Sequence, residues 1–293
     1  MDAQATNKQV DQTEFVQMTD EEAMYQEEAM IMEKRGRRLR RAALTAGIFQ
    51  AISIVCIMYT AITVRWVLIE WNQPERTAYE IGNSIGLFKM GIVADTTMVI
   101  SETFVGVLLG LILIGAGVNP ATSSLIITFK VVATAIMGAN VIFMIAAGLL
   151  LDENLPIYKT VSQYFYSDYQ PPIGTQLAYL MLLINKYGLT FAQVFSGVHL
   201  GLLGFTIVMW GVFPRWMGYT ILLAGPMLIL NSFLIFVMPG YDGAISFFFM
   251  IPYFVGTIWL AGWCLVNTPH PSKNREFGSY PQEDQVLEPQ QEQ

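Results

Sequence analysis

Charged side chains are scarce in this sequence of 293 residues, where Asp, Glu, Lys and Arg make up only 13% of the chain. Soluble domains average about 25%, so a soluble globular fold is excluded. Long stretches lack all four residue types, and each approaches the ~20 residues that cross a hydrocarbon core about 30 Å thick. These stretches are 42–64, 131–151, 187–214, 216–241 and 243–268, and a sixth, 91–117, is interrupted only by Asp95 and Glu102. The sequence therefore predicts an all-α integral membrane bundle of six spans.

Cysteine and histidine are equally rare. Cys56 and Cys264 both fall inside predicted spans, which excludes a disulfide framework. His199 is the one histidine in a span, since His270 follows the last one, so a haem held by two histidines is excluded. The chain also lacks a Glu-x-x-His pair and a Cys-x-x-Cys pair. We therefore expect no metal site and no catalytic residue, and we assign no cofactor.

The charges that are present lie mostly in the tails. Acidic residues dominate residues 1–33 and 269–293 and supply most of the net charge of −7. Basic residues gather just before the first span, where they predict contact with anionic lipid head groups and a cytoplasmic position: Lys34, Arg35, Arg37, Arg38, Arg40 and Arg41. We expect a cytoplasmic N-terminal tail (1–41), a membrane domain (42–268) and a cytoplasmic C-terminal tail (269–293) in a bacterial inner membrane.

Two connecting segments differ from simple loops. The link 73–90 has an amphipathic end that we expect to lie at the membrane interface. The loop 152–186 is the longest, and its second half, 176–185, is apolar but too short to span a bilayer. The sequence therefore predicts an interfacial or re-entrant helix before the fourth span.

Several motifs resemble those of a known family. Segment 84–95 reads SIGLFKMGIVAD, and FSGVHLGLLG at 195–204 is followed by FPRWMG at 213–218 and LAG at 223–225. These resemble the signatures of a bacterial multi-pass membrane family catalogued as domain of unknown function 4386, over roughly residues 40–268. The resemblance implies a six-helix bundle and no known activity. The chain departs from the family where Gly256-Thr-Ile-Trp259 lacks an acidic residue, which puts any role of that acid in doubt here.

Polar residues inside the spans form the candidate site. Counting 1.5 Å per residue places Asp95 about 7 Å, Glu102 about 18 Å and His199 about 14 Å from the outer surface. Lys130 enters from the inner side, and its side chain either snorkels back to that side or reaches toward Glu102. Asn140 and Asn231 fall near the depth of Asp95. We favour a structural role in which Glu102 pairs with His199 or Lys130, and Asp95 pairs with the asparagines. A proton or cation path, a small-ligand pocket and catalysis remain alternatives.

The functional prediction follows from these exclusions. We expect a non-enzymatic multi-pass protein that contacts the lipid bilayer and belongs to a larger membrane assembly with protein partners, without nucleic acid. The alternative is a small proton- or cation-coupled transporter or channel that uses Asp95, Glu102 and His199. A weaker third class is a membrane enzyme acting on a lipid or quinone, and no small-molecule ligand is assigned.

Overall fold

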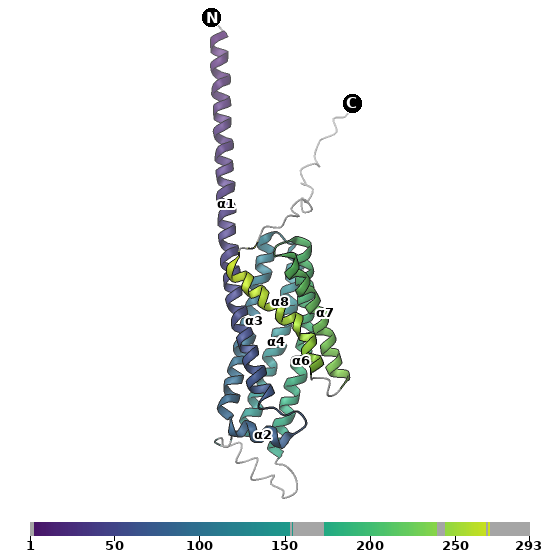
Figure 1. The fold of residues 1–293 in the computed structure, drawn as a ribbon. Helices are drawn as coiled ribbons and strands as arrows, with labels where there is room; N and C mark the ends of the chain where they lie inside the picture. Colours follow the sequence, from purple (N-terminus) through teal and green to yellow (C-terminus); the bar gives the residue numbers. More distant parts are fainter. Residues whose placement is uncertain (1–2, 153, 155–172, 239–243, 268, 270–293) are drawn as a thin grey trace, which may run out of the picture.

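The structure of this chain is a computed structural model, which describes residues 3–152, 154, 173–238, 244–267 and 269, with the backbone alone for 3–23 and 27–29. Regular structure in the described residues is entirely helical (Figure 1). The elements are α1 (Ala3–Tyr59), the π-helix η1 (Thr60–Trp66), α2 (Pro74–Asn83), α3 (Ile85–Ala116), α4 (Pro120–Leu151), α6 (Ile173–Trp210), α7 (Arg215–Val237) and α8 (Ala244–Val266). Six helices are long and apolar enough to cross a bilayer, which confirms the predicted membrane bundle.

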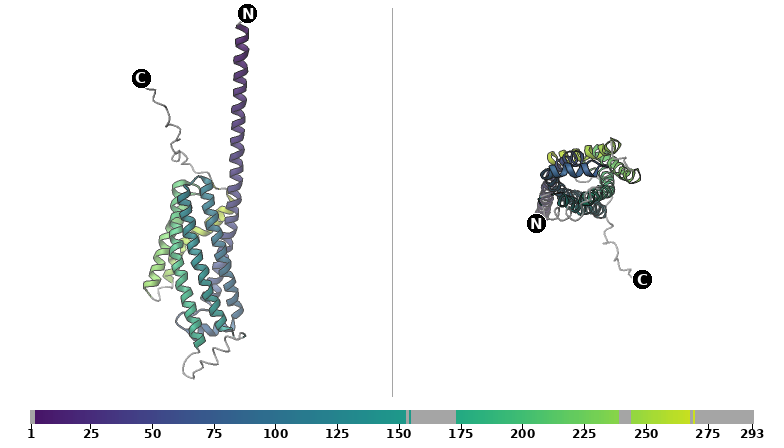
Figure 2. Two further views of the ribbon diagram at one scale, coloured as in Figure 1. Left: turned by 180° about the vertical axis from the view of Figure 1, so that it is seen from behind. Right: turned by 90° about the horizontal axis from the view of Figure 1, so that it is seen from below.

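These six helices form a closed ring. Among the described elements, α1 packs on α3, α3 on α4, α4 on α6, α6 on α7, α7 on α8, and α8 returns to α1. The end-on view in Figure 2 shows this circular order, with no helix along the axis. Glycine permits the closest approach: a Cβ added at Gly204 would lie 2.3 Å from the Leu222 amide nitrogen. Small residues allow such backbone contacts between helices in membranes.

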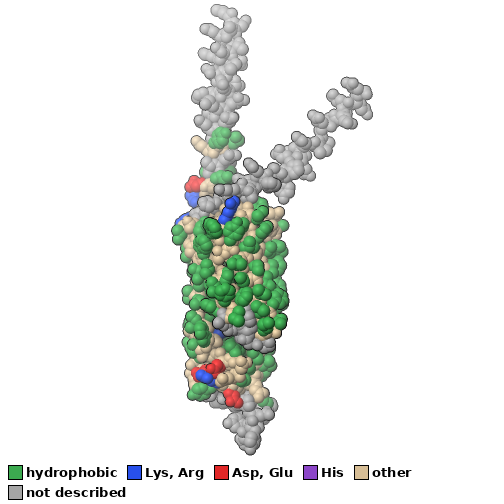
Figure 3. All heavy atoms as spheres, turned by 45° about the vertical axis from the view of Figure 1, so that its right-hand side comes forward, with side chains coloured by type: hydrophobic (Ala, Val, Ile, Leu, Met, Phe, Trp, Pro, Cys, Tyr) green, Lys and Arg blue, Asp and Glu red, His purple; other side chains and the backbone are tan. Residues whose placement is uncertain are grey.

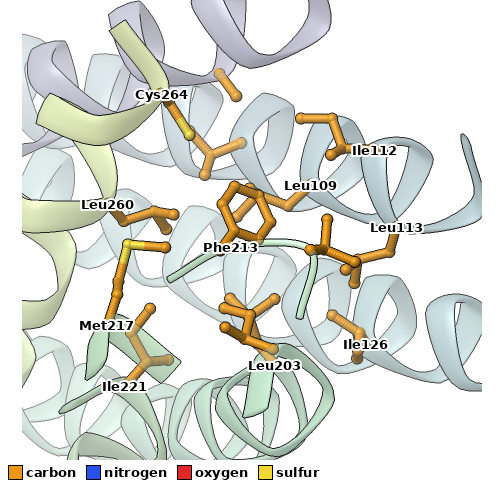
Figure 4. Packing of buried hydrophobic residues seen from close by; sticks show 14 of the residues in the cluster. Leu109, Ile112, Leu113, Ile126, Leu203, Phe213, Met217, Ile221, Leu260 and Cys264 are labelled. Atoms are coloured by element: carbon orange, nitrogen blue, oxygen red, sulfur yellow. The ribbon is translucent and has the colours of Figure 1, made fainter. Parts of the chain in front are cut away.

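The two ends of the ring differ. At the end that we call the arginine end, Arg35 and Arg40 of α1 contact the C-termini of α3 and α8. A buried apolar cluster fills the ring near this end, with Phe213 from the short α6–α7 connection at its centre (Figure 4). The opposite end, which we call the α2 end, has a second buried cluster around Phe88 that includes Ile81 of α2. Each end of the ring is therefore sealed by hydrophobic packing.

Helix lengths indicate where a bilayer would lie. Helices α7 and α8 have 23 residues each, whereas α3 and α4 have 32 and α6 has 38. At 1.5 Å per residue, 23 residues extend ~35 Å and 38 residues ~57 Å. The longer helices therefore continue past a ~30 Å core at the α2 end. Figure 3 shows an apolar belt over the face in view, with charged side chains at its two ends.

One prediction about the loops is wrong. Residues 176–185 do not form a separate interfacial or re-entrant helix, because they are part of α6, which runs without interruption from Ile173 to Trp210. No proline occurs between these residues, and a continuous helix keeps every backbone group hydrogen-bonded in an apolar setting. The amphipathic helix lies in the earlier link instead, as α2. Residues 155–172 of the long loop lie outside the described residues.

Candidate functional site

A buried ion pair joins α3 to α4 inside the ring. Glu102 of α3 and Lys130 of α4 are 4% and 6% exposed. The ammonium group of Lys130 donates a hydrogen bond to Oε2 of Glu102. The other carboxylate oxygen, Oε1, accepts hydrogen bonds from the Ser53 hydroxyl and from Nε2 of Gln50 at 3.3 Å, both on α1. Three donors from two neighbouring helices thus surround one carboxylate.

Glycine 106 makes room for the lysine in this pair. Gly106 lies one helical turn from Glu102 on α3. A Cβ added there would come within 2.2 Å of Cγ of Lys130. The aliphatic stem of Lys130 therefore lies directly against the α3 backbone, and it delivers the ammonium group to the next turn of the helix.

Two further titratable side chains, His199 and Tyr253, interact with the pair. Nδ1 of His199 on α6 lies 2.9 Å from the carbonyl oxygen of Ile126. A carbonyl can only accept, so Nδ1 donates and Nε2 is the proton-accepting atom of the neutral ring. His199 interacts electrostatically with Glu102 and Lys130, and Tyr253 of α8 interacts with Glu102. We define the Glu102 layer as Gln50, Ser53, Glu102, Lys130, His199 and Tyr253.

The Glu102 layer lies near the middle of the membrane core. Measured from the arginine end at 1.5 Å per residue, Glu102 lies ~20 Å, Lys130 ~15 Å and His199 ~17 Å along their helices. On α3, the layer lies between Phe88 of one apolar cluster and Val105 of the other. Electrostatic interactions are stronger in such water-poor surroundings, and an unpaired charge is correspondingly costly.

A second ion pair lies closer to the α2 end. Arg65 donates from one Nη atom to Oδ2 of Asp95 at 2.8 Å and from the other to the Thr60 hydroxyl at 3.0 Å. The π-helical turn widens the backbone spiral so that residues five apart, such as Thr60 and Arg65, come onto one side. The expected pairing of Asp95 with asparagines is wrong, because Asp95 pairs with Arg65. The predicted first span ended at residue 64, whereas the π-helix extends it to Trp66 and brings Arg65 to Asp95. Oδ1 of Asp95 is buried without a hydrogen-bond partner among the described residues.

The two asparagines lie elsewhere. The side-chain nitrogen of Asn185 donates to the backbone carbonyl of Asn140 at 2.9 Å, and Gly188 packs on the Asn140 side chain. Asn231 is 1% exposed, and its Oδ1 has no hydrogen-bond partner among the described residues. Neither asparagine hydrogen-bonds to a residue of the Glu102 layer in the described part of the chain.

The basic cluster divides into two groups. Nε of Arg35 donates to the carbonyl of Gly115 at 2.7 Å, near the C-terminus of α3. Arg40 donates to the carbonyl of Val266 at the C-terminus of α8 at 3.4 Å. These contacts satisfy carbonyls that have no partner within their own helix. They also place positive charges at the negative ends of the helix dipoles, where such charges are stabilising. The other members of the cluster remain exposed at this end: Lys34, Arg37, Arg38 and Arg41.

A third ion pair lies at the α2 end, between the first turns of α3 and the residue that follows α4. Lys89 donates to Oδ2 of Asp152 at 2.6 Å. The backbone amide of Asn154 donates to the other oxygen at 3.1 Å. The hydrogen bond from Lys89, and then that from Asn154, holds the pKa of Asp152 below its ordinary value. The carboxylate is therefore favoured over the acid form.

Sequence reasoning located Glu102, Lys130 and His199 but missed the partners from α1. Gln50, Ser53 and Thr60 are spaced by three and seven residues, which places them on one helical face of an otherwise apolar span. That periodicity was the available signal. Tyr253 carried no such signal, because an isolated tyrosine in a span is usually an interfacial or packing residue.

Comparison with known proteins gives one result. A family model described as domain of unknown function (DUF4386) matches residues 45–267. No curated protein and no solved structure matches the chain. Among the described residues, no group of three or more His, Cys, Asp or Glu side chains is arranged to hold a metal ion. The matched segment contains every residue of the Glu102 layer, and the chain belongs to this family, whose function is unknown.

Proposed function

We propose that the protein is a non-enzymatic membrane transporter in which Glu102 binds and releases a proton during each cycle. The observation that carries this proposal is the Glu102–Lys130 ion pair, which is buried at mid-membrane depth next to a titratable histidine. Ionisable residues inside membrane spans most often mark an ion or substrate pathway, because burying them is costly.

The surroundings of the pair support exchange of a proton. Replacing the pair by apolar residues would be neutral or favourable for stability, so stability alone gives little reason for two charges at this depth. His199 adds a second proton acceptor in the same layer. Asp95 lies between Glu102 and the α2 end, and one of its oxygens has no hydrogen-bond partner among the described residues, so it offers an intermediate acceptor.

Proton flux in reconstituted vesicles tests the proposal. Vesicles containing the protein are given a pH gradient and an opposing membrane potential, and internal pH is followed with a trapped dye. We expect flux well above that of empty vesicles, and we expect Glu102→Gln to reduce it at least tenfold. Glu75→Gln, which removes an exposed acid on α2, serves as the matched control and should retain full flux. Equal flux in the parent protein and in Glu102→Gln would contradict the proposal, as would absence of flux in the parent both with and without a small organic anion in the medium.

A second proposal concerns protein partners. Helix α1 continues well beyond the ring, and in the described part of the chain this extension packs on no other helix (Figure 1). Residues 1–33 are strongly acidic. We propose that this extension binds a basic surface of a partner protein. Cross-linking in membranes should recover a partner from the full chain and lose it when residues 1–30 are deleted; recovery from both would contradict this.

We also propose the orientation. The exposed basic residues at the arginine end favour a cytoplasmic position in a bacterial inner membrane. The α2 end, with its pairs Arg76–Glu70 and Lys89–Asp152, would then face the opposite side.

A further inference from the structure

We infer that the Glu102 layer is a binding site for a small organic anion carrying a carboxylate, which enters together with the proton taken up by Glu102. This inference rests on the proposed function and names its substrate class. In the present structure, Glu102 itself occupies the position that such a carboxylate would take.

The donors around Glu102 form the complement of a carboxylate. Lys130 supplies a positive charge on one oxygen, and Ser53 and Gln50 donate to the other. Carboxylate and phosphate oxygens are bound in proteins by this combination of an ammonium group with neutral donors. If the Glu102 side chain turned away, all three donors would remain without an acceptor at one place inside the ring.

The packing favours movement of Glu102 over movement of Lys130. The stem of Lys130 lies against the backbone at Gly106, where even one added methyl group would overlap it. The stem that carries the ammonium group is therefore confined on its α3 side. A cation substrate could bind Glu102 only if the confined Lys130 side chain moved away. An anion could bind Lys130 if the Glu102 side chain moved away instead.

Charge balance links the proton to the anion. A proton on Glu102 converts the carboxylate to a neutral acid, and the Lys130 ammonium then lies buried without its counter-charge, which is costly. An entering carboxylate restores neutrality, so one proton and one anion move together. On release the anion leaves, Glu102 loses its proton, and the Glu102–Lys130 pair forms again.

The groups facing Glu102 are compatible with this exchange. Helix α1 contributes the neutral side chains of Gln50 and Ser53, α4 contributes Lys130, α6 contributes His199, and α8 contributes Tyr253. Among the described residues that interact with Glu102, none is an acid. A bound anion would therefore meet Lys130 without a competing carboxylate once Glu102 is protonated.

Thermal stability of Glu102→Gln in detergent tests the inference, with acetate as the probe. The variant leaves Lys130 without its counter-ion, so sodium acetate should raise its melting temperature saturably and at least three times more than it raises that of the parent. Sodium chloride and choline acetate at matched ionic strength separate anion from cation effects. Glu102→Gln/Lys130→Met, which lacks the positive charge, should show no saturable shift.

Each outcome decides the question. A shift that follows sodium and not acetate would indicate a cation site, and an equal shift in the double variant would indicate adventitious binding; either overturns the inference. Should Glu102→Gln not fold, the parent is mixed with acetate in weakly buffered detergent, where uptake of one proton per bound acetate is expected and absence of uptake contradicts it. Proton flux that depends on Glu102 but not on any carboxylate would leave the proposed function standing and overturn this inference alone.

Discussion

At the scale of single residues, the Glu102–Lys130 pair is the most consequential contact in the ring. Both side chains are almost fully buried, so each charge depends on the other for compensation. Breaking such a pair costs more than removing it, because the remaining charge is left in apolar surroundings. This asymmetry distinguishes a true pair from two charges that happen to be close.

Removal of one partner should therefore destabilise the protein more than removal of both. We expect Lys130→Met and Glu102→Gln each to cost about 3–5 kcal/mol, and the double variant to cost less than the sum of the two. Chemical denaturation in mixed micelles measures the three values. Additive losses would contradict direct contact.

The Asp152–Lys89 pair should make stability depend on pH. The pKa of Asp152 is lower in the folded protein than its ordinary value of about 3.9. Its stabilising contribution is therefore complete above about pH 5 and is lost as pH falls through 3.9 toward the lower folded value. The difference in melting temperature between the parent and Asp152→Asn should shrink over this range. A difference in melting temperature that stays constant from pH 6 to pH 3 would contradict a stabilising contribution from the Asp152 carboxylate.

At the scale of elements, the π-helix η1 positions the second ion pair. Its register brings Val64 directly against Gly91 of α3, and Arg65 onto Asp95 one turn further along. A Cβ added at Gly91 would lie 2.4 Å from Cγ2 of Val64. The absence of a side chain at residue 91 therefore permits the close approach of η1 and α3.

Gly91→Ala should displace η1 and weaken the Arg65–Asp95 contact. Overpacking of this kind costs about 1–3 kcal/mol. Gly86→Ala on the same helix is the matched control, because nothing lies within 4 Å of a Cβ added there. Unfolding free energies of both variants, and of Gly91→Ala combined with Val64→Ala, provide the measurement. A loss in Gly86→Ala as large as that in Gly91→Ala would exclude a specific clash.

The sequence predicted the spans well and the contacts between them only in part. Long uncharged stretches identify membrane helices because lipid excludes charge, and this rule does not depend on packing. Depth along a helix follows from its rise, and this rule placed Glu102 and His199 in one layer. Helix rotation and neighbour order are set by packing, and the π-turn at Thr60–Trp66 extended a helix past the charged residue Arg65. The pairing of Asp95 was therefore missed.

At the scale of the whole molecule, the closed ring explains how one carboxylate can be reached from several helices. Sequential packing of α1 through α8 with closure onto α1 points the inner faces at a common axis. Apolar clusters seal both ends, and the Glu102 layer lies between them. Access to the layer along the ring axis therefore requires one end to open.

The two ends of this ring should lie on opposite sides of the membrane. Single cysteines at exposed Arg38 and Glu75, in a background without Cys56 and Cys264, allow labelling of intact cells with an impermeant maleimide. We expect labelling of the Glu75 position and protection of the Arg38 position until the membrane is permeabilised. Labelling of Arg38 alone in intact cells would reverse the proposed orientation.

The central claim is that Glu102 changes its protonation state, and infrared difference spectroscopy observes this directly. Spectra of the reconstituted protein are recorded with and without acetate labelled with carbon-13, which separates the probe from side-chain bands. We predict that binding produces a protonated carboxyl band that is absent in Glu102→Gln and retained in Glu75→Gln. Binding of acetate to the parent protein without this band, or the same band in Glu102→Gln, would contradict the account.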